Sequence, residues 1–283
     1  MKERITITLD SELIKHIDKR IDGNIIKNRS QQIELFLTKA LGTYRPEKAV
    51  ILVGGKIVSS RSQAKIPRCM MEVQGRTVME HLFDLLKKYG IRDVITGVSY
   101  MKERVMDYYG DGSKFGVNIT YIEEEGQLGT AGSLKLAKEH LKDSFIVTNG
   151  DELKSLNIPR MFRLHKRKDA LATIALTTVT DPTEYGVVRV SGSRVLDYIE
   201  KPKADEAPSN LINAGFYILE PEILDMIPDG YSMLEKDIFP KLAKQGRLRG
   251  FIIGGQWFDI GNPGRYEIAK KKWTGVSLYD ETE

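Results

Sequence analysis

Residues 49–73 combine an apolar run, a glycine pair and several cations, a combination suited to binding phosphate. The stretch reads AVILVGGKIVSSRSQAKIPRCMMEV. Its aliphatic start is typical of a strand that is buried on both faces. A glycine turn after such a strand brings backbone N–H groups close to a ligand, and the cations that follow can neutralise phosphate. The alternative, an ordinary turn between a strand and a helix, stays open for this stretch taken alone.

Two aspartates that follow apolar runs could hold a divalent cation. Asp151 stands in NGDEL, and Asp259 stands in WFDIGNPGRY near the end of the chain. Mg²⁺ binds one or two protein carboxylates and takes its other ligands from water and phosphate oxygens. Taken alone, each aspartate is more typical of a turn or a helix cap.

The region from residue 49 to residue 273 resembles the sugar-1-phosphate nucleotidyltransferases. That family opens with a strand followed by GGxGTRLxPLTxxxPKPM, to which AVILVGG and the later Pro67, Arg68 and Met70 correspond. NGDEL resembles the family's metal-binding motif, and WFDIGNPGRY resembles its WxDIGTPxDY motif. The resemblance implies transfer of a nucleotide from a nucleoside triphosphate to a sugar 1-phosphate, with Mg²⁺ on Asp151 and Asp259.

The phosphate loop departs from the family motif. Ile57 stands where the family has its third glycine, Ser59 where it has arginine, and the loop is one residue shorter before Pro67. Phosphoryl transfer depends on positioning and on cations placed against developing charge, so these changes predict weak or lost catalysis. The remaining cations, Arg61 and Arg68, would neutralise the leaving pyrophosphate.

Further motifs match the family's sugar and base sites. The resemblance implies that EYGVV, IEKP and INAGFYILEPEIL surround the sugar phosphate, and that QLGTA and the glycine pair approach the base. Lys201 would bind the sugar phosphate during catalysis. The sugar-binding residues implied in this way are Gly186, Glu200, Asn213 and Gly215, and the nucleotide-binding residues are Gly54, Gly55, Gln127 and Gly129.

The element pattern of residues 46–283 predicts an α/β fold with a doubly wound, Rossmann-like sheet. Strands are expected at 93–99, 117–122 and 144–148, alternating with helices at 77–89, 102–109 and 127–141. A hairpin at 185–200 and a helix over 232–245 are expected later. In such a fold, ligands lie at the carboxyl ends of the strands.

Residues 1–45 form a separate small domain in this prediction. RITITL at 4–9 alternates apolar and polar residues like a half-buried strand, and two amphipathic helices follow, the first capped by Asp10 or Ser11. This order resembles the ribbon-helix-helix repressors, which pair their strands across a dimer and insert the ribbon into the DNA major groove. The DNA-binding residues implied are Arg4, Thr6 and Thr8 for bases, and Asn28, Arg29 and Ser30 for phosphate.

Composition limits the possible functions. The 283 residues include one cysteine, Cys69, which excludes an internal disulfide and a cysteine-based metal site. No apolar run reaches the roughly 20 residues that a membrane helix needs, and the charged start is unlike a signal peptide, so we expect a cytoplasmic protein. Residues 1–45 carry nine Lys/Arg against six Asp/Glu, which favours a polyanion partner.

These features together predict a homodimeric regulator that binds a palindromic DNA operator. Its large domain would bind a sugar nucleotide or sugar phosphate, with catalysis weak or lost. The alternative is an active sugar-1-phosphate nucleotidyltransferase whose N-terminal domain serves dimerisation or autoregulation.

Overall fold

The computed structural model describes residues 5–21, 26–40, 45–53, 58–59, 65–99, 101–124, 126–168 and 170–276. The chain divides into two compact units, Met1–Tyr44 and Arg45–Glu283. The division lies within one residue of the boundary expected from the sequence. Each unit is described by itself.

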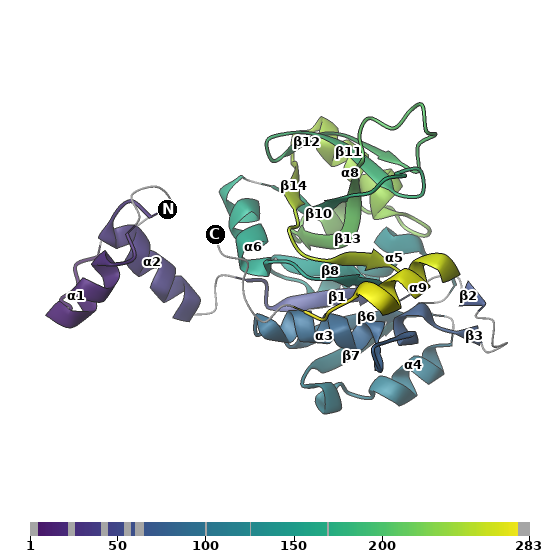
Figure 1. Ribbon diagram of the computed structural model, residues 1–283, viewed down its shortest axis with the longest axis horizontal. Coiled ribbons are helices and arrows are strands. Elements are labelled where there is room, and N and C mark those ends of the chain that lie inside the picture. Colours follow the sequence, from purple (N-terminus) through teal and green to yellow (C-terminus); the bar gives the residue numbers. More distant parts are fainter. Residues whose placement is uncertain are drawn as a thin grey trace. The chain divides into compact units, whose positions relative to one another are not determined.

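The smaller unit contains two helices among its described residues, α1 (Ser11–Asp18) and α2 (Arg29–Ala40) (Figure 1). Asp10 begins α1, because its carboxylate accepts a hydrogen bond of 2.8 Å from the backbone N–H of Glu12. Asn28 begins α2 in the same way, with the N–H of Gln31 at 3.0 Å. Asp10 is one of the two caps predicted for the first helix.

The strand predicted for residues 4–9 does not form in the single chain. Residues 5–10 carry no strand, and Ile5 and Ile7 are 70% and 48% exposed. An extended segment becomes a strand only when its N–H and C=O groups pair with a neighbouring strand, and the described part of this unit offers none. The strand is therefore absent from the single chain, and its pairing between two copies, as the resemblance implies, stays a prediction.

The larger unit is built on a nine-stranded sheet, counted over its described residues, in the order β10-β14-β12-β11-β13-β8-β1-β6-β7. The strands are β1 (Lys48–Leu52), β6 (Asp93–Val98), β7 (Asn118–Glu123), β8 (Phe145–Asn149), β10 (Ala172–Thr178), β11 (Gly186–Ser191), β12 (Arg194–Glu200), β13 (Leu211–Leu219) and β14 (Leu248–Ile252). Strands β8, β1, β6 and β7 run parallel, as predicted. Strand β13 runs antiparallel to β8, so the sheet is mixed rather than parallel throughout.

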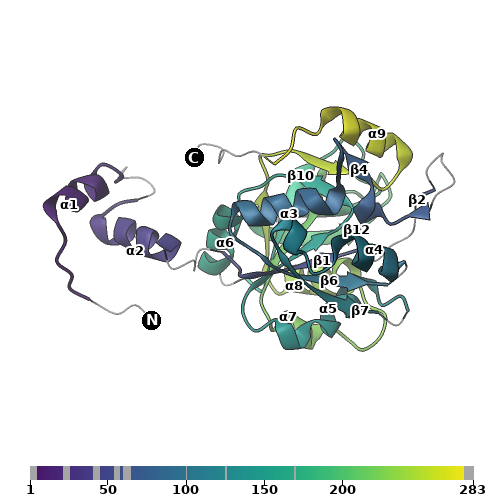
Figure 2. The same ribbon diagram turned by 90° about the horizontal axis from the view of Figure 1, so that it is seen from below.

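The helices of this unit cover both faces of the sheet (Figure 2). They are α3 (Val78–Lys88), α4 (Lys102–Tyr109), α5 (Gly129–Leu136), α6 (Ile158–Arg167), α7 (Ile223–Met226), α8 (Phe239–Lys244) and α9 (Pro263–Lys272). In β1, Val50 and Leu52 pack in the core under α5 and α8, whereas Ala49 and Ile51 pack with α3, α4 and α6. Successive side chains of a strand point to opposite faces, so β1 is buried on both, as its apolar run predicted.

Short strands complete the unit. They are β2 (Val58–Ser59) with β3 (Lys65–Ile66), β4 (Glu72–Val73) with β5 (Arg76–Thr77), and β9 (Glu152–Lys154) with β15 (Trp257–Asp259). The pairing of β9 with β15 joins segments more than one hundred residues apart, and the N–H of Ile260 donates to the backbone oxygen of Asp151 at 3.3 Å. This pairing brings the segment that carries Asp151 beside the segment that carries Asp259. The helix expected over 232–245 begins instead with a π-helical turn, Leu234–Ile238, before α8.

Candidate functional site

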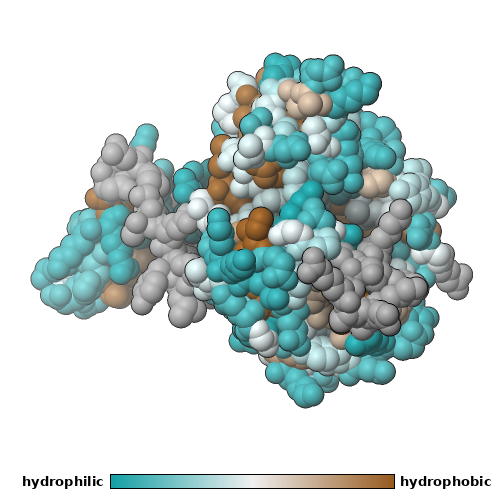
Figure 3. Space-filling view, turned by 45° about the vertical axis from the view of Figure 1, so that its right-hand side comes forward, coloured by the Kyte–Doolittle hydropathy of each residue, from teal (hydrophilic) through white to brown (hydrophobic). Residues whose placement is uncertain are grey.

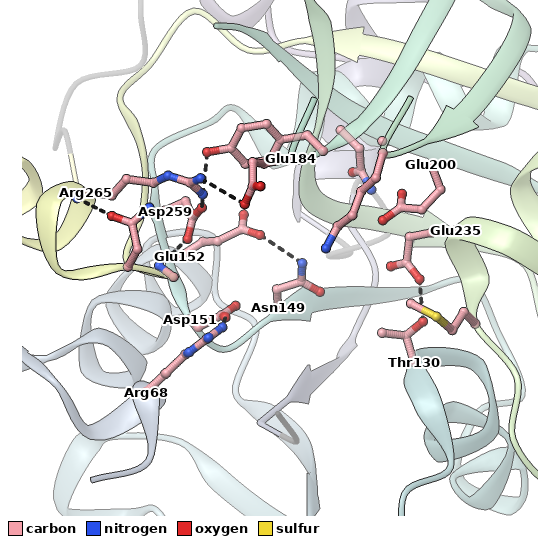
Figure 4. Close-up of a pocket in the computed structure, with 17 residues that line it drawn as sticks. Arg68, Thr130, Asn149, Asp151, Glu152, Glu184, Glu200, Glu235, Asp259 and Arg265 are labelled. Atoms are coloured by element: carbon pink, nitrogen blue, oxygen red, sulfur yellow. Dashed lines mark hydrogen bonds and ion pairs between the residues drawn. The ribbon is translucent and has the colours of Figure 1, made fainter. Parts of the chain in front are cut away.

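A cavity of about 300 Å³ opens where β8 and β12 end (Figure 4). Its lining residues come from segments distributed over most of the larger unit. They are Arg68, Thr130, Asn149, Asp151, Glu152, Glu184, Tyr185, Gly186, Glu200, Lys201, Asn213, Met233, Glu235, Asp259, Gly261, Asn262 and Arg265. We name two parts of it: the arginine side (Arg68, Asp151, Glu184, Asp259, Arg265) and the glutamate side (Thr130, Glu200, Asn213, Glu235).

On the arginine side, Asp151 forms an ion pair with Arg68. The distance between Oδ2 of Asp151 and Nη1 of Arg68 is 2.9 Å, and both side chains are partly exposed. Arg68 belongs to a short 3₁₀ turn, Arg68–Met70, that follows Pro67. Its Nε is buried and has no hydrogen-bond partner within the described ranges, so the guanidinium keeps donor capacity beyond the ion pair.

Asp259 is surrounded by donors. Its Oδ2 forms an ion pair with Nη1 of Arg265 and accepts a hydrogen bond of 3.2 Å from the Tyr185 hydroxyl, while its Oδ1 accepts from the backbone N–H of Gly261. Arg265 also reaches Glu184, with Nη2 and Oε2 3.4 Å apart. Burial and the negative charge of Asp259 raise the pKa of Tyr185, so its hydroxyl remains a donor.

A buried ion pair joins the cavity-lining Glu152 to Lys154. Nζ of Lys154 is 3.0 Å from Oε2 of Glu152 and donates to the backbone oxygen of Gly215 at 2.8 Å. Glu152 also accepts hydrogen bonds of 2.9 Å from the side chains of Asn149 and Trp257. Burial raises the pKa of Glu152, and the ammonium of Lys154 opposes that rise. Glu152 is thus fixed by three donors immediately beside Asp151.

Gly215 makes this arrangement possible. Its φ is +59°, and a Cβ at this position would stand 2.4 Å from Oε1 of Glu152. Only glycine combines this conformation with so close an approach. Gly215 was predicted to bind sugar, but it is not among the cavity-lining residues and instead packs against Glu152.

The glutamate side holds its carboxyl groups with neutral donors. Tyr198 donates its hydroxyl to Glu200 at 3.2 Å, while Thr130 donates to Glu235 at 2.6 Å and Tyr217 donates to Glu235 at 3.3 Å. Burial raises the pKa of Glu235, and burial together with the charge of Glu235 raises that of Glu200. Both groups therefore favour the protonated form more than an exposed glutamate does.

Asn213 and Gly186 fix the shape of the same side. The amide of Asn213 donates to the hydroxyls of Tyr198 and Tyr217 at 3.1 and 2.8 Å. A Cβ at Gly186 would lie 2.0 Å from the Tyr198 hydroxyl oxygen, so no other residue fits without displacing that ring. A glycine in this position leaves backbone facing the cavity.

The arrangement does not fit a divalent cation bound directly between Asp151 and Asp259. Each carboxylate already has a guanidinium as its counter-ion, and both oxygens of Asp259 accept hydrogen bonds. Over the described ranges, no group of three or more His, Cys, Asp or Glu side chains is placed to hold a metal ion. The oxygens are of the kind that Mg²⁺ prefers, but the paired arginines repel a cation.

The cavity brings together predicted residues from separate motifs, namely Arg68, Asp151, Gly186, Glu200, Lys201, Asn213 and Asp259. Gln127 is exposed and Gly129 begins α5; neither lines the cavity. Four predicted residues lie outside the described ones: Arg4, Gly54, Gly55 and Arg61.

The predicted DNA-binding residues that the structure describes lie on the surface of the smaller unit. Thr6, Thr8 and Ser30 are exposed, and Asn28 caps α2. Arg29 is bound within the unit, because its Nε and Nη2 each donate to Asp18 at 2.7 Å. A DNA phosphate would therefore have to share this guanidinium with Asp18.

Several lining residues were not predicted. Glu152 adjoins Asp151 in NGDEL and Arg265 is the next-to-last residue of WFDIGNPGRY, so their positions inside matched motifs were an available signal. Glu235 and Thr130 had no such signal, because they meet only through packing of the π-helical turn against α5.

Hydrophilic residues dominate the face shown in Figure 3, where hydrophobic residues gather in small separate patches. No helix among the described residues has the length and apolar character needed to cross a membrane.

The Nucleotidyl transferase family profile matches residues 48–274. A UTP–glucose-1-phosphate uridylyltransferase of Synechocystis is 38% identical over 232 residues, covering 76% of this chain and 60% of the relative. A mannose-1-phosphate guanyltransferase of Yarrowia lipolytica is 36% identical over 239 residues, covering 82% and 64%. This chain thus spans less than two thirds of the length of these relatives.

Among solved structures, HddC from Yersinia pseudotuberculosis complexed with GMP-PN superposes with a TM-score of 0.66. Its sequence is 27% identical, and the match covers 80% of this chain and 99% of HddC. The similarity agrees with the α/β fold predicted for residues 46–283.

Proposed function

The chain belongs to the nucleotidyl transferase family, and from this premise we propose that it is an active sugar-1-phosphate nucleotidyltransferase. One observation carries the proposal. Lys201, Glu200 and Asn213 line the same cavity as Asp151 and Asp259, although the motifs that contain them are far apart in the chain. This favours the enzyme alternative over a regulator that has lost catalysis.

Arg68 on the arginine side and Lys201, which follows Glu200 in the cavity lining, suit the phosphate groups. An oxygen of the sugar 1-phosphate attacks the α-phosphorus of the nucleoside triphosphate, the bond from that phosphorus to the bridging oxygen breaks, and pyrophosphate leaves. Lys201 and Arg68 supply positive charge for the phosphates, and catalysis of this kind consists mainly of positioning and charge stabilisation. This reaction requires no side-chain nucleophile, because an oxygen of the sugar 1-phosphate attacks directly.

The glutamate side suits the sugar. Buried carboxyl, amide and hydroxyl groups in fixed positions discriminate between sugar hydroxyl patterns, because a mismatched hydroxyl leaves a buried polar group unpaired. Glu200 and Asn213 are the residues that we expect to contact the sugar.

Pyrophosphate release tests this proposal. Full-length protein is incubated with UTP, GTP or dTTP, combined with glucose 1-phosphate or mannose 1-phosphate, first with MgCl₂ and then with EDTA. We expect turnover with at least one pair, abolished by Lys201→Ala and retained by Lys203→Ala, whose side chain is 80% exposed. Absence of turnover with every pair in both conditions would count against the enzyme and favour a binding protein.

DNA binding and homodimerisation through residues 1–45 stay predictions for the smaller unit. The two capped helices and the exposed Ile5, Ile7, Leu13 and Leu37 support a role in pairing two chains. Light scattering of the full chain and gel shifts on selected and random DNA test these two points separately. A monomer, or equal binding to both DNAs, would contradict the respective prediction.

A further inference from the structure

We propose that Arg68 and Arg265 take the place of a divalent cation in this cavity. Asp151 and Asp259 then hold the two guanidiniums, which supply positive charge for the phosphates of the ligand without Mg²⁺. The proposal rests on the proposed function, because it concerns how that site balances the charge of a sugar 1-phosphate and a nucleotide. The resemblance implied Mg²⁺ between these carboxylates, whereas the ion pairs give each carboxylate a guanidinium as its counter-ion.

The geometry gives each carboxylate its own guanidinium. Nη1 of Arg68 lies 2.9 Å from Oδ2 of Asp151, and Nη1 of Arg265 contacts Oδ2 of Asp259. Tyr185 and the N–H of Gly261 complete the shell of Asp259. A cation approaching Asp259 would have to displace Arg265 and would meet donor hydrogens instead of free lone pairs.

The two guanidiniums supply to Asp151 and Asp259 the two positive charges that one Mg²⁺ would bring, and Glu184 adds one further negative charge beside Arg265. Arg265 is further fixed by Glu184 at 3.4 Å and by the Tyr185 ring, whose centroid is 5.1 Å from its guanidinium carbon. Arg68, whose ion pair with Asp151 uses Nη1, can still present its other N–H groups to phosphate oxygens.

The sequence supports the same conclusion at Arg265. The motif WxDIGTPxDY has an aspartate where WFDIGNPGRY has Arg265, six residues after Asp259. This exchange changes the local charge by two units beside the carboxylate that the resemblance assigns to the metal. A cationic side chain that forms an ion pair with Asp259 replaces the motif's anionic one.

Mn²⁺ binding to the full-length protein tests the proposal without relying on activity. Mn²⁺ alone is titrated and followed by electron paramagnetic resonance. We expect only weak Mn²⁺ binding by the wild-type protein, and binding about 10- to 100-fold tighter by Arg265→Asp, in the range by which residues around a metal alter its affinity. Arg265→Gln, which removes the charge without adding a carboxylate, serves if the first variant does not fold, and a smaller gain in the same direction is expected.

The matched control is Arg189→Asp, which removes another arginine that is paired with an aspartate, Asp197, on the β11–β12 hairpin. It should leave Mn²⁺ binding at the wild-type level. Wild-type binding as tight as in the Arg265 variants, or variants with no gain, would overturn the proposal.

Turnover in EDTA separates this inference from the proposed function. Pyrophosphate release that persists in EDTA supports both. Release that occurs only with MgCl₂ leaves the enzyme proposal intact and overturns the guanidinium proposal. If no release occurs in either condition, the enzyme proposal fails, and the Mn²⁺ titration alone decides the inference.

Discussion

The two sides of the cavity hold carboxyl groups in opposite ways. On the arginine side, Asp151 and Asp259 remain partly accessible and are paired with guanidiniums. On the glutamate side, Glu235 is buried and Glu200 is half-buried, and both are held by the neutral hydroxyls of Tyr198, Thr130 and Tyr217. The first arrangement gives each carboxylate a cationic partner, whereas burial on the glutamate side raises the pKa of both glutamates.

This difference separates two kinds of recognition within one cavity. Charged pairs at an open edge can exchange partners with phosphate groups, because guanidinium binds carboxylate and phosphate with similar geometry. An enclosed network of neutral donors and acceptors distinguishes hydroxyl positions on a sugar. The ion pair of Glu152 and Lys154 lies beside Asp151, next to the arginine side.

The largest effect is expected from Lys154→Met. This change removes a fully buried ammonium and leaves Glu152 without its ion-pair partner. Breaking a buried pair by removing one partner costs about 3–5 kcal/mol. Urea unfolding should show this loss in the free energy of unfolding, and the double variant Lys154→Met/Glu152→Gln should recover part of it. A loss below about 1 kcal/mol, the usual value for a surface pair, would show that the pair does not support the site.

The next effect is a loss of turnover on substitution of Lys201. Lys201→Ala removes the ammonium expected to bind the sugar phosphate, and loss of one preorganised charge donor costs about 10²- to 10³-fold in kcat. Lys203→Ala, two residues away and exposed, is the control. Steady-state kinetics of pyrophosphate release should show a fall in kcat. A change confined to KM would mean that Lys201 contributes to binding alone.

Much of the larger unit could be predicted because its signals are local. The apolar run of β1, the helix at Lys102–Tyr109 and the hairpin of β11 and β12 were found from side-chain periodicity and turn residues. Motif matches then located Glu200, Lys201 and Asn213 in the cavity. These features depend on neighbours within a few residues, which a sequence displays directly.

The remaining features depend on pairs that are distant in the chain. Nothing local in the sequence indicates that β9 pairs with β15 or that Thr130 meets Glu235. The segment at residues 5–10 failed for the same reason, because a strand needs a partner that the isolated chain does not provide. Tertiary contacts, rather than propensities, decide these cases.

A smaller effect is expected from Glu200→Gln on the glutamate side. The substitution keeps the size of the side chain but changes how it can bond to a sugar hydroxyl, and a hydrogen bond of this kind contributes about 0.5–1.5 kcal/mol. We expect KM for the sugar 1-phosphate to rise by about 2- to 10-fold at that energy, with little change in kcat. Glu206→Gln, on an exposed loop, is the control. A fall in kcat comparable with that of Lys201→Ala would remove the distinction between the two sides.

The smallest effect concerns pH and Glu235. Burial raises the pKa of Glu235, so the folded protein retains this proton to a higher pH than the unfolded chain, whose glutamates titrate near about 4.3. The stabilising contribution of the protonated group is therefore complete below that value and is lost as the pH rises through the raised pKa. Glu235→Gln cannot titrate and keeps acceptors for Thr130 and donors for its surroundings.

Urea unfolding at pH 4, 6 and 8 should show the wild type losing stability relative to Glu235→Gln as the pH rises, whereas Glu103→Gln, at an exposed position of α4, should show no such trend. A wild type that gains stability relative to Glu235→Gln over this range would mean that Glu235 is charged in the folded protein. The glutamate side would then hold its carboxylates as the arginine side does, and a counter-ion such as Lys201 would be the first candidate for the pairing.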